Sequence, residues 1–200
     1  QPAGMQKAAF QLFDHILRRN RSFEFVVFAD SLYPGVSKWE KLPRVTFIET
    51  PLQEWSLTHG HLWEQLQLPG LCRRFNCDLA HHPMTTSPVT KTKCKSLVTL
   101  HDLNYYNHPE WFSPLFCAAY RYCAPSGLRR ADRVVSPSNY VFNQARKILR
   151  LPEERLRMVY NGTIPLPAAS HPPEDSNPYV LCVGTQSPHK NLARLIRAFQ

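Results

Sequence analysis

Apolar residues along this chain follow two alternating patterns, one at helical spacing and one in unbroken runs. Helical spacing predicts amphipathic helices over residues 5–19, 62–75, 114–128 and 139–149. Continuous apolar runs over 25–29 and 45–48 predict strands that are covered on both faces. Short apolar-rich segments predict further strands over 78–81, 96–100, 133–136 and 156–160. Strands that alternate with helices build a parallel sheet with helices on both faces, so the pattern predicts an α/β fold.

The pattern changes between residues 165 and 178, where prolines follow one another too closely for a helix or a strand ladder. After this stretch, residues 179–183 form another apolar run that predicts a new buried strand, and an amphipathic helix opens near Lys190. One strand and one helix cannot bury a core by themselves. We therefore predict an N-terminal domain over 1–164, a linker over 165–178, and the truncated start of a second α/β domain over 179–200.

Composition narrows the class of protein. The 200 residues are 43% apolar, enough to bury a core, and no apolar stretch is long enough to cross a membrane. The chain opens without Met or a signal peptide, so we expect a fragment of a cytoplasmic protein. A net charge of +9 suggests an acidic partner: nucleic acid, anionic lipid or a phosphorylated substrate. No RNP-like strand, KH loop or paired-cysteine finger accompanies that charge, so we do not expect nucleic acid.

The six cysteines are scattered over more than half of the chain, several of them inside apolar runs. An even count is compatible with disulfides, but no CxxC pair and no export signal accompany it. Reduced, half-buried thiols are therefore the better interpretation. Zinc could use Cys72, Cys77, His81 and His82, but their loose spacing does not favour a metal site.

Small polar and titratable residues recur directly after the predicted strands. In an open parallel α/β sheet, ligands bind beyond the carboxyl ends of the strands, which is where these residues fall. They are His81, His82, His101, Asp102, Ser136, Ser138, Asn161, Gly184, Thr185 and Lys190. At any single position a cap or a turn is the simpler explanation, and Ser138 is a good N-cap. Recurrence along one edge favours a binding site there.

Two positions near helix starts are candidates for binding an anion. Gly4 precedes the first helix, where a residue without a side chain lets backbone N–H groups approach a phosphate. Lys190 and Asn191 stand at the start of the last predicted helix, where an ammonium group lies beside free backbone N–H groups. The simpler alternatives are a turn at Gly4 and an exposed surface lysine at Lys190.

Several motifs are absent from the sequence. No Asp-x-Asp is present to hold a divalent ion against a diphosphate, and no Walker, complete GxGxxG or GxSxG motif occurs. Kinases, nucleotide triphosphatases and nicotinamide-dependent enzymes are therefore disfavoured. We expect neither a metal ion nor a cofactor.

The motifs resemble those of retaining glycosyltransferases of family 4, which have the GT-B fold. The resemblance rests on the order and spacing of several segments and covers almost the whole chain. The segments are 63–66, 78–83, 98–103, 131–138, 159–163, 183–185 and 189–192. The most similar subgroup makes bacterial surface polysaccharides, lipopolysaccharide among them, often from mannose donors.

The resemblance implies an enzyme with two Rossmann-like domains that moves a sugar, without a metal, from a nucleotide-diphosphate sugar to a glycan or lipid-linked acceptor. His101 matches the family's histidine beside the transferred sugar, and Lys190 matches a lysine that binds the donor diphosphate. Gly4 falls where the family has a glycine-rich loop, and Ser136 and Ser138 line the same cleft. A lipid-linked acceptor is compatible with peripheral contact at the inner face of the cell membrane.

Three departures from the family pattern affect this expectation. The strand before the Gly4 loop is absent, Thr185 stands where an arginine is common, and the family's Glu-x7-Glu motif should fall past Gln200. We therefore expect the fragment alone to be weakly active or inactive. Two other hypotheses stay open: a non-catalytic module that binds a nucleotide sugar or an acceptor, and a basic protein that binds nucleic acid or a membrane surface.

Overall fold

The computed structural model describes residues 4–30, 32–33, 35–50, 57–163, 180–184 and 187–199. Its α-helices are α1 (Gly4–Arg19), α2 (Leu57–Leu66), α3 (Leu68–Arg74), α4 (Asn104–Asn107), α5 (Pro114–Arg130), α6 (Asn139–Lys147) and α7 (Leu192–Phe199). Its strands are β1 (Phe25–Ala29), β2 (Val45–Glu49), β3 (Leu79–His82), β4 (Lys95–Thr99), β5 (Arg133–Ser136) and β6 (Leu156–Met158). Short 3₁₀ turns complete the set: η1 (Val36–Lys41), η2 (Pro109–Trp111), η3 (Glu153–Arg155) and η4 (Pro188–Lys190).

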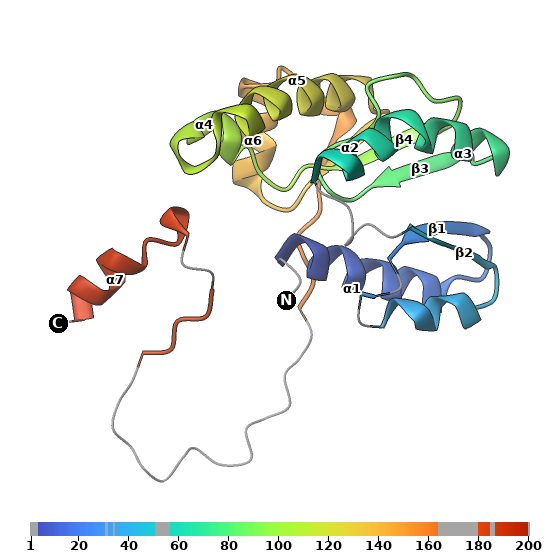
Figure 1. Ribbon diagram of the computed structural model, residues 1–200, viewed down its shortest axis with the longest axis horizontal. Coiled ribbons are helices and arrows are strands. Elements are labelled where there is room, and N and C mark those ends of the chain that lie inside the picture. The colour runs from blue at the N-terminus through green and yellow to red at the C-terminus, as the bar shows by residue number, and fades with distance from the viewer. Residues whose placement is uncertain are drawn as a thin grey trace, which may run out of the picture.

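All described strand pairs are parallel, and the strands form two sheets. One sheet pairs β1 with β2, and the other has the order β3-β4-β5-β6. Figure 1 shows α1 and η1 beside β1 and β2, with the remaining helices of the α/β body grouped around the four-stranded sheet. The predicted α/β fold with parallel strands and flanking helices is confirmed, while the expected single sheet is divided in two.

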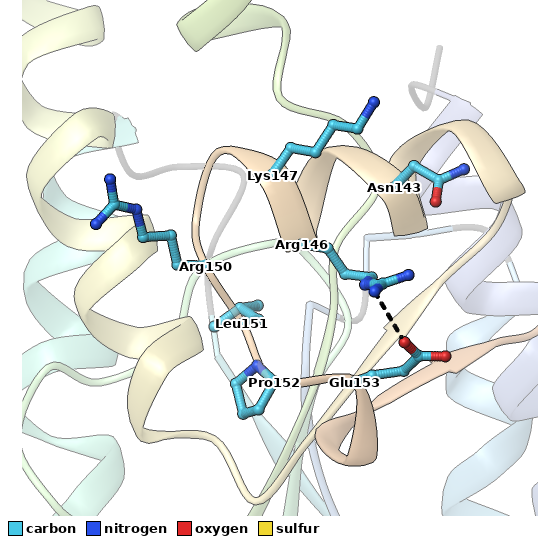
Figure 2. Close-up of a pocket in the computed structure, with 7 residues that line it drawn as sticks. All are labelled: Asn143, Arg146, Lys147, Arg150, Leu151, Pro152 and Glu153. Atoms are coloured by element: carbon cyan, nitrogen blue, oxygen red, sulfur yellow. Dashed lines mark ion pairs between the residues drawn. The ribbon is translucent and has the colours of Figure 1, made fainter.

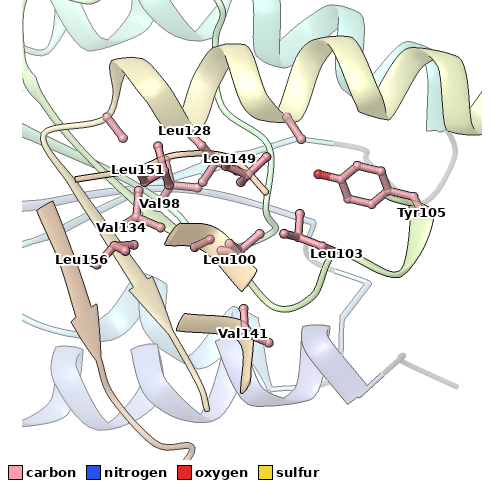
Figure 3. Close-up of a cluster of buried hydrophobic side chains, with 13 residues drawn as sticks. Val98, Leu100, Leu103, Tyr105, Leu128, Val134, Val141, Leu149, Leu151 and Leu156 are labelled. Atoms are coloured by element: carbon pink, nitrogen blue, oxygen red, sulfur yellow. The ribbon is translucent and has the colours of Figure 1, made fainter. Parts of the chain in front are cut away.

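The main core lies on one face of the four-stranded sheet. Val98, Val134 and Leu156 occupy the same register row of β4, β5 and β6 and are each at most 2% exposed. Ala124 and Leu128 of α5 cover this row from one helix, and residues of α6 cover it from another. Figure 3 shows these side chains converging, with Tyr105 at one end of the cluster. Each residue of this row comes from one of the strands predicted from the sequence.

A second core belongs to the smaller sheet. Leu17 of α1 and Val36 and Trp39 of η1 are buried there, and partly buried side chains from β1 and β2 pack around them. The indole Nε1 of Trp39 donates to Asp14 Oδ1 at 2.9 Å, which ties η1 to α1. Aromatic contacts join the two sheets, since Phe28 of β1 packs on Trp63 of α2 with ring centroids 5.8 Å apart.

Helix boundaries follow local chemistry. The Ser113 hydroxyl accepts from Phe116 N at the start of α5, and the Ser138 hydroxyl accepts from Val141 N at the start of α6. The helix expected over 62–75 with an interruption near Pro69 is two helices, α2 and α3, that meet at Gln67, so the interruption is confirmed. Gly4 is the first residue of α1 rather than part of a preceding loop.

One predicted strand is wrong. Residues 180–183, expected as part of a buried strand, have no strand structure, and Val180, Leu181 and Val183 are 56%, 75% and 87% exposed. A strand needs a neighbour for its backbone hydrogen bonds, and no strand in the described ranges lies beside this segment. The predicted linker over 165–178 and the predicted strand residue Tyr179 lie outside the described residues.

Two further expectations concern cysteines and membranes. All six cysteines are free, as expected for reduced thiols, and Cys72 and Cys117 are buried. In the part of the chain that the structure describes, no helix combines the length and the apolar character that crossing a membrane requires.

Candidate functional site

Predicted residues end or follow each of the strands β3, β4, β5 and β6: His81, His82, His101, Asp102, Ser136, Ser138 and Asn161. His82 is the last residue of β3, and Ser136 is the last residue of β5. His101 follows β4 after one intervening residue, Ser138 follows β5, and Asn161 lies beyond β6. Because these strands are parallel neighbours, their ends meet at one edge of the sheet. We call this edge the carboxyl edge.

His101 is held by the loop that follows β3. Its backbone N donates to Thr85 Oγ1 at 3.2 Å, and its ring Nε2 lies 2.7 Å from the carbonyl oxygen of Pro83. A carbonyl oxygen only accepts, so Nε2 carries the proton in this contact. The other ring nitrogen, Nδ1, is therefore the one that can serve a ligand, as an acceptor while the ring is neutral.

The loop itself, residues 83–89, is buried and polar, and we call it the 83–89 loop. Thr85, Thr86 and Ser87 are 7%, 4% and 2% exposed. Thr85 has a φ of 69°, in the left-handed region that a β-branched residue rarely occupies. Its backbone N donates to Thr99 O at 3.0 Å, which anchors the loop on the end of β4.

Residues of α2 and α5 also contact this loop. Gln65 Nε2 donates to Ser87 O at 3.1 Å, and Gln65 Oε1 accepts from Val89 N at 2.7 Å. Gly127 of α5 lies directly against Ser87. A Cβ added at Gly127 would come within 3.0 Å of Ser87 O and closer still to Ser87 Oγ.

Glu64, next to Gln65 on α2, lies between two histidines. Its Oε1 is 3.7 Å from His82 Nδ1, and its Oε2 is 3.8 Å from His61 Nδ1. These separations are longer than a hydrogen bond and suit ion pairs. Burial alone raises the pKa of Glu64, but His61, His82 and the Thr86 hydroxyl outweigh it and lower the pKa from 4.5 to about 2. Glu64 is therefore an anion at neutral pH.

A polar chain continues from His61 into the helices. His61 Nε2 lies 3.1 Å from the hydroxyl of Tyr120 on α5, and the Tyr120 ring contacts Tyr105 with centroids 5.5 Å apart. Burial raises the pKa of Tyr105 and Tyr120. Both phenols are thus neutral and available as hydrogen-bond donors.

The two serines have different surroundings. Ser136 is fully buried, and its hydroxyl has no hydrogen-bond partner among the described residues. The Ser138 hydroxyl accepts a hydrogen bond from Val141 N, which confirms the N-cap role predicted from the sequence. Its hydroxyl proton remains a potential hydrogen-bond donor. Asn161 is exposed.

Asp102 shapes the turn after β4. Its Oδ1 accepts from Asn104 N at 2.9 Å, which forms a local turn leading into α4. Its charge also contributes to the raised pKa of Tyr105, after the larger effect of burial. The residue therefore links the His101 turn to the tyrosine pair.

The remaining predicted residues lie elsewhere. Gly4 is exposed at the start of α1, and an added Cβ there would meet nothing within 4 Å. Gly184, Lys190 and Asn191 are exposed, and Asn191 takes a left-handed φ of 52° between η4 and α7. Thr185 lies outside the described residues. Figure 1 shows α7 apart from the sheets, and the ring of His189 contacts Trp111 of η2 at 5.7 Å between centroids.

Neither a metal cluster nor the cavity at the end of α6 adds to this edge. The described residues include no group of three or more His, Cys, Asp or Glu side chains placed to hold a metal ion. A cavity of about 480 Å³ lies at the end of α6, away from the carboxyl edge. In Figure 2, Arg146 turns toward Glu153, its ion-pair partner at 3.1 Å, whereas Lys147 and Arg150 point in other directions. Their charges do not converge on one ligand.

Several residues of this edge were not singled out from the sequence as site candidates. They are His61, Glu64, Gln65, Thr85, Thr86, Ser87, Tyr120 and Gly127. The one available signal was the segment Trp63–Leu66, which pattern similarity marked without a role. Their partners lie about 20 or more residues away in most cases, beyond the reach of local periodicity.

Comparison with known proteins identifies the family. The sequence pattern of Glycosyltransferase Family 4 matches residues 3–165, which include both sheets and the whole carboxyl edge. No curated protein and no solved structure matches the chain significantly. The matched stretch is far more than half of the 200 residues and carries the α/β architecture described above. The chain therefore belongs to Glycosyltransferase Family 4.

Proposed function

We propose that this chain is the acceptor-side part of a retaining glycosyltransferase that uses a nucleotide-diphosphate sugar. Membership of the family establishes glycosyl transfer in general. The observation that carries the finer proposal is His101, whose ring is fixed through Nε2 on the carboxyl edge and leaves Nδ1 for a sugar hydroxyl. Orientation of the transferred sugar needs this kind of fixed polar group.

Catalysis of this reaction depends mainly on stabilising the negative charge of the leaving diphosphate. Breaking the bond from the anomeric carbon to the diphosphate builds negative charge on the leaving oxygen and positive charge on the sugar ring. Fixed positive groups near the diphosphate stabilise that charge. Lys190 and the N–H groups at the starts of α1 and α7 are the groups that we assign to this role. The sequence offers no Asp-x-Asp for a metal, so the proposed reaction is metal-independent.

The proton of the acceptor hydroxyl needs a separate destination. In a front-face retaining path, the departing phosphate oxygen accepts it, and His101 orients the sugar without acting as the general base. Ser136 and Ser138 supply hydroxyl donors at the same edge. The neighbouring Asp102 accepts from Asn104 N and shapes the turn that leads into α4.

The proposal also names the classes of donor and acceptor. We propose a hexose donor, with mannose as the first candidate, and a glycan or lipid-linked acceptor of a cell-surface polysaccharide. The +9 charge supports a peripheral position on an anionic membrane at its cytoplasmic side. A non-catalytic nucleotide-sugar-binding module is the second candidate, because Figure 1 shows α7, which follows Lys190, apart from the sheets.

A donor panel tests the proposal. The full-length gene product is incubated with UDP-, GDP- and ADP-sugars and lipid extract, and products are analysed by mass and anomeric configuration. A retained anomer with one donor supports the enzyme. Binding of a donor without any product supports the module, and binding that falls steeply with salt and yields no product supports a charge-driven surface protein.

Substitution of the proposed diphosphate ligand sharpens this test. Lys190→Ala in the full-length enzyme should lower donor turnover by about 10²-fold, because one fixed charge is lost from the leaving group. Arg194→Ala, on the exposed side of α7, is the matched loss of a cation. Turnover near the wild-type value in Lys190→Ala would remove the role assigned to Lys190.

A further inference from the structure

The 83–89 loop makes almost every contact that orients His101, yet it has no regular secondary structure of its own. Pro83 O and Thr85 Oγ1 are the two groups that hold His101. Both lie in the loop, so the direction of the imidazole depends on the path of the loop. That path needs support from outside.

The support comes from two helices, α2 and α5. On the α2 side, the Gln65 amide grips the loop at Ser87 O and Val89 N, and the Glu64 carboxylate interacts with the Thr86 hydroxyl. On the α5 side, the absence of a side chain at Gly127 leaves room for Ser87. The donors and acceptors of Gln65 are both used, which fixes the amide in one orientation.

Backbone strain shows that the loop is held rather than relaxed. Thr85 keeps a φ of 69° although it is β-branched. Such a conformation costs about 1–3 kcal/mol and persists only where surrounding contacts determine it. Once the Gln65 grip is removed, the loop can lower its free energy by leaving this conformation. Thr85 Oγ1 and Pro83 O would then move away from His101.

From these contacts we propose that Gln65 and Gly127 are positioning residues, which act through the 83–89 loop to hold His101 with its Nε2 proton on Pro83 O and its Nδ1 facing the ligand. The proposal deepens the function proposed above, and its kinetic test rests on that function. Its structural test does not, because the protonation pattern of an imidazole ring is observable without any substrate.

The structural test is NMR of the histidine ring nitrogens in this chain. Protonated and unprotonated ring nitrogens have well-separated ¹⁵N shifts, and His101→Gln identifies the His101 signals among the nine histidines. In the wild type we expect a single tautomer with the proton on Nε2. Gln65→Ala removes two hydrogen bonds to the loop, and Gly127→Ala adds a Cβ against Ser87, so both should give averaged shifts for His101.

Matched controls separate loop position from general damage to the helices. Gln67→Ala removes an exposed glutamine just past the end of α2, and Gly60→Ala adds a Cβ that meets nothing within 4 Å. Both should leave the His101 tautomer unchanged. If Gln65→Ala does not fold by circular dichroism, Gln65→Glu keeps the size of the side chain and the acceptor for Val89 N but loses the donor to Ser87 O.

The kinetic test uses the full-length enzyme. Gln65→Ala and Gly127→Ala should lower kcat by about 10- to 100-fold, with the donor KM nearly unchanged, because misplacement of an orienting group acts mainly on the transition state. Wild-type His101 shifts in a folded Gln65→Ala or Gln65→Glu would overturn the positioning role. A changed tautomer in a protein that transfers no sugar would instead leave the positioning role standing and remove the proposed function.

Discussion

The two ends of the four-stranded sheet differ in how deeply their polar side chains are buried. At the carboxyl edge, polar side chains are buried close to one another, as with Glu64 at 3.7 Å from His82, which is 4% exposed. At the opposite end, which we call the amino edge, charged groups face solvent and pair singly. There Lys95 and Asp132 form an ion pair at 2.9 Å with side chains 76% and 37% exposed.

The amino edge also collects the basic helix ends. In a parallel α/β sheet the helices run opposite to the strands, so their C-termini lie beside the strand starts. Basic pairs close α3, α5 and α6, at Arg73–Arg74, Arg129–Arg130 and Arg146–Lys147. Cations at helix C-termini are favourable on electrostatic grounds alone. Six of the 24 Lys and Arg residues thus lie where helix electrostatics favour a cation, and these six do not mark the candidate site.

The largest expected effect comes from the apolar layer beneath the carboxyl edge. Leu100 is fully buried and directly precedes His101. Leu100→Ala should lower the free energy of unfolding by about 2–5 kcal/mol, through lost burial and a residual cavity. Urea unfolding of this chain measures the change. Leu115→Ala, at a position 80% exposed on α5, is the matched control and should have almost no effect.

The dependence of stability on acidic pH tests the buried charge of Glu64 at the carboxyl edge. The folded pKa of Glu64 is about 2, below its ordinary 4.5, so the native state binds fewer protons between these values. The resulting stabilisation, about 3 kcal/mol, is complete above pH 4.5 and is lost as pH falls toward 2. Urea unfolding of Glu64→Gln across this range should give a flatter profile than the wild type. A profile of equal slope would contradict the depressed pKa.

His81, at the same edge, should change the stability over a higher pH range than Glu64 does. Burial is the main cause that lowers the pKa of His81 from 6.5 to about 4, so the unfolded state binds the extra proton between these values. Stability therefore falls as pH drops from 6.5 to 4. His81→Gln should remove this step and keep the step of Glu64, which lets one titration separate the two.

At the amino edge we expect a smaller change. Asp132→Asn breaks the exposed pair with Lys95 and weakens the acceptor for Ser96 N, which Asp132 Oδ2 binds at 3.0 Å. Exposed ion pairs contribute no more than about 1 kcal/mol, and less in salt. Urea unfolding at low and high ionic strength checks both statements. A loss as large as that of Leu100→Ala would break the contrast between the two edges.

The smallest effect on stability is expected at Ser136. Its buried hydroxyl has no partner in the described part of the chain, so Ser136→Ala removes a group whose desolvation is uncompensated. Stability should stay level or rise slightly. If turnover of the full-length enzyme falls in the same variant, the hydroxyl serves a ligand, and if turnover is unchanged, its assignment as a binding residue fails.

Much of the fold was predictable from local patterns. The six strands from β1 to β6 and the helices α1, α5 and α6 appear within a few residues of their expected bounds, because periodicity and caps such as Ser138 are properties of short segments. Helix α4 was not predicted, and α2 begins five residues before its expected start. The exception is the run ending at Val183, whose apolar residues predicted a strand and are exposed in the structure. Apolar composition creates the tendency, but a ladder needs a partner.

The candidate site was predictable only in part. His82, His101 and Ser136 were expected at strand ends, and parallel topology puts them on one edge. Which nitrogen of His101 is bound, and by what, was not predictable, because Pro83 and Thr85 reach it through a loop with an irregular backbone. Gln65 and Gly127 were missed for the same reason, since Ser87 is their common neighbour and lies far from both in sequence.

By itself, the amino-acid sequence determined the order of elements, the parallel α/β class and the identity of the residues after each strand, since hydrophobic spacing and turn chemistry act over a few residues. Tertiary structure decided the division into two sheets, the burial of Glu64 between His61 and His82, and the grip of Gln65 on the 83–89 loop. These features depend on contacts between residues distant in sequence, and such contacts form only when whole elements pack together.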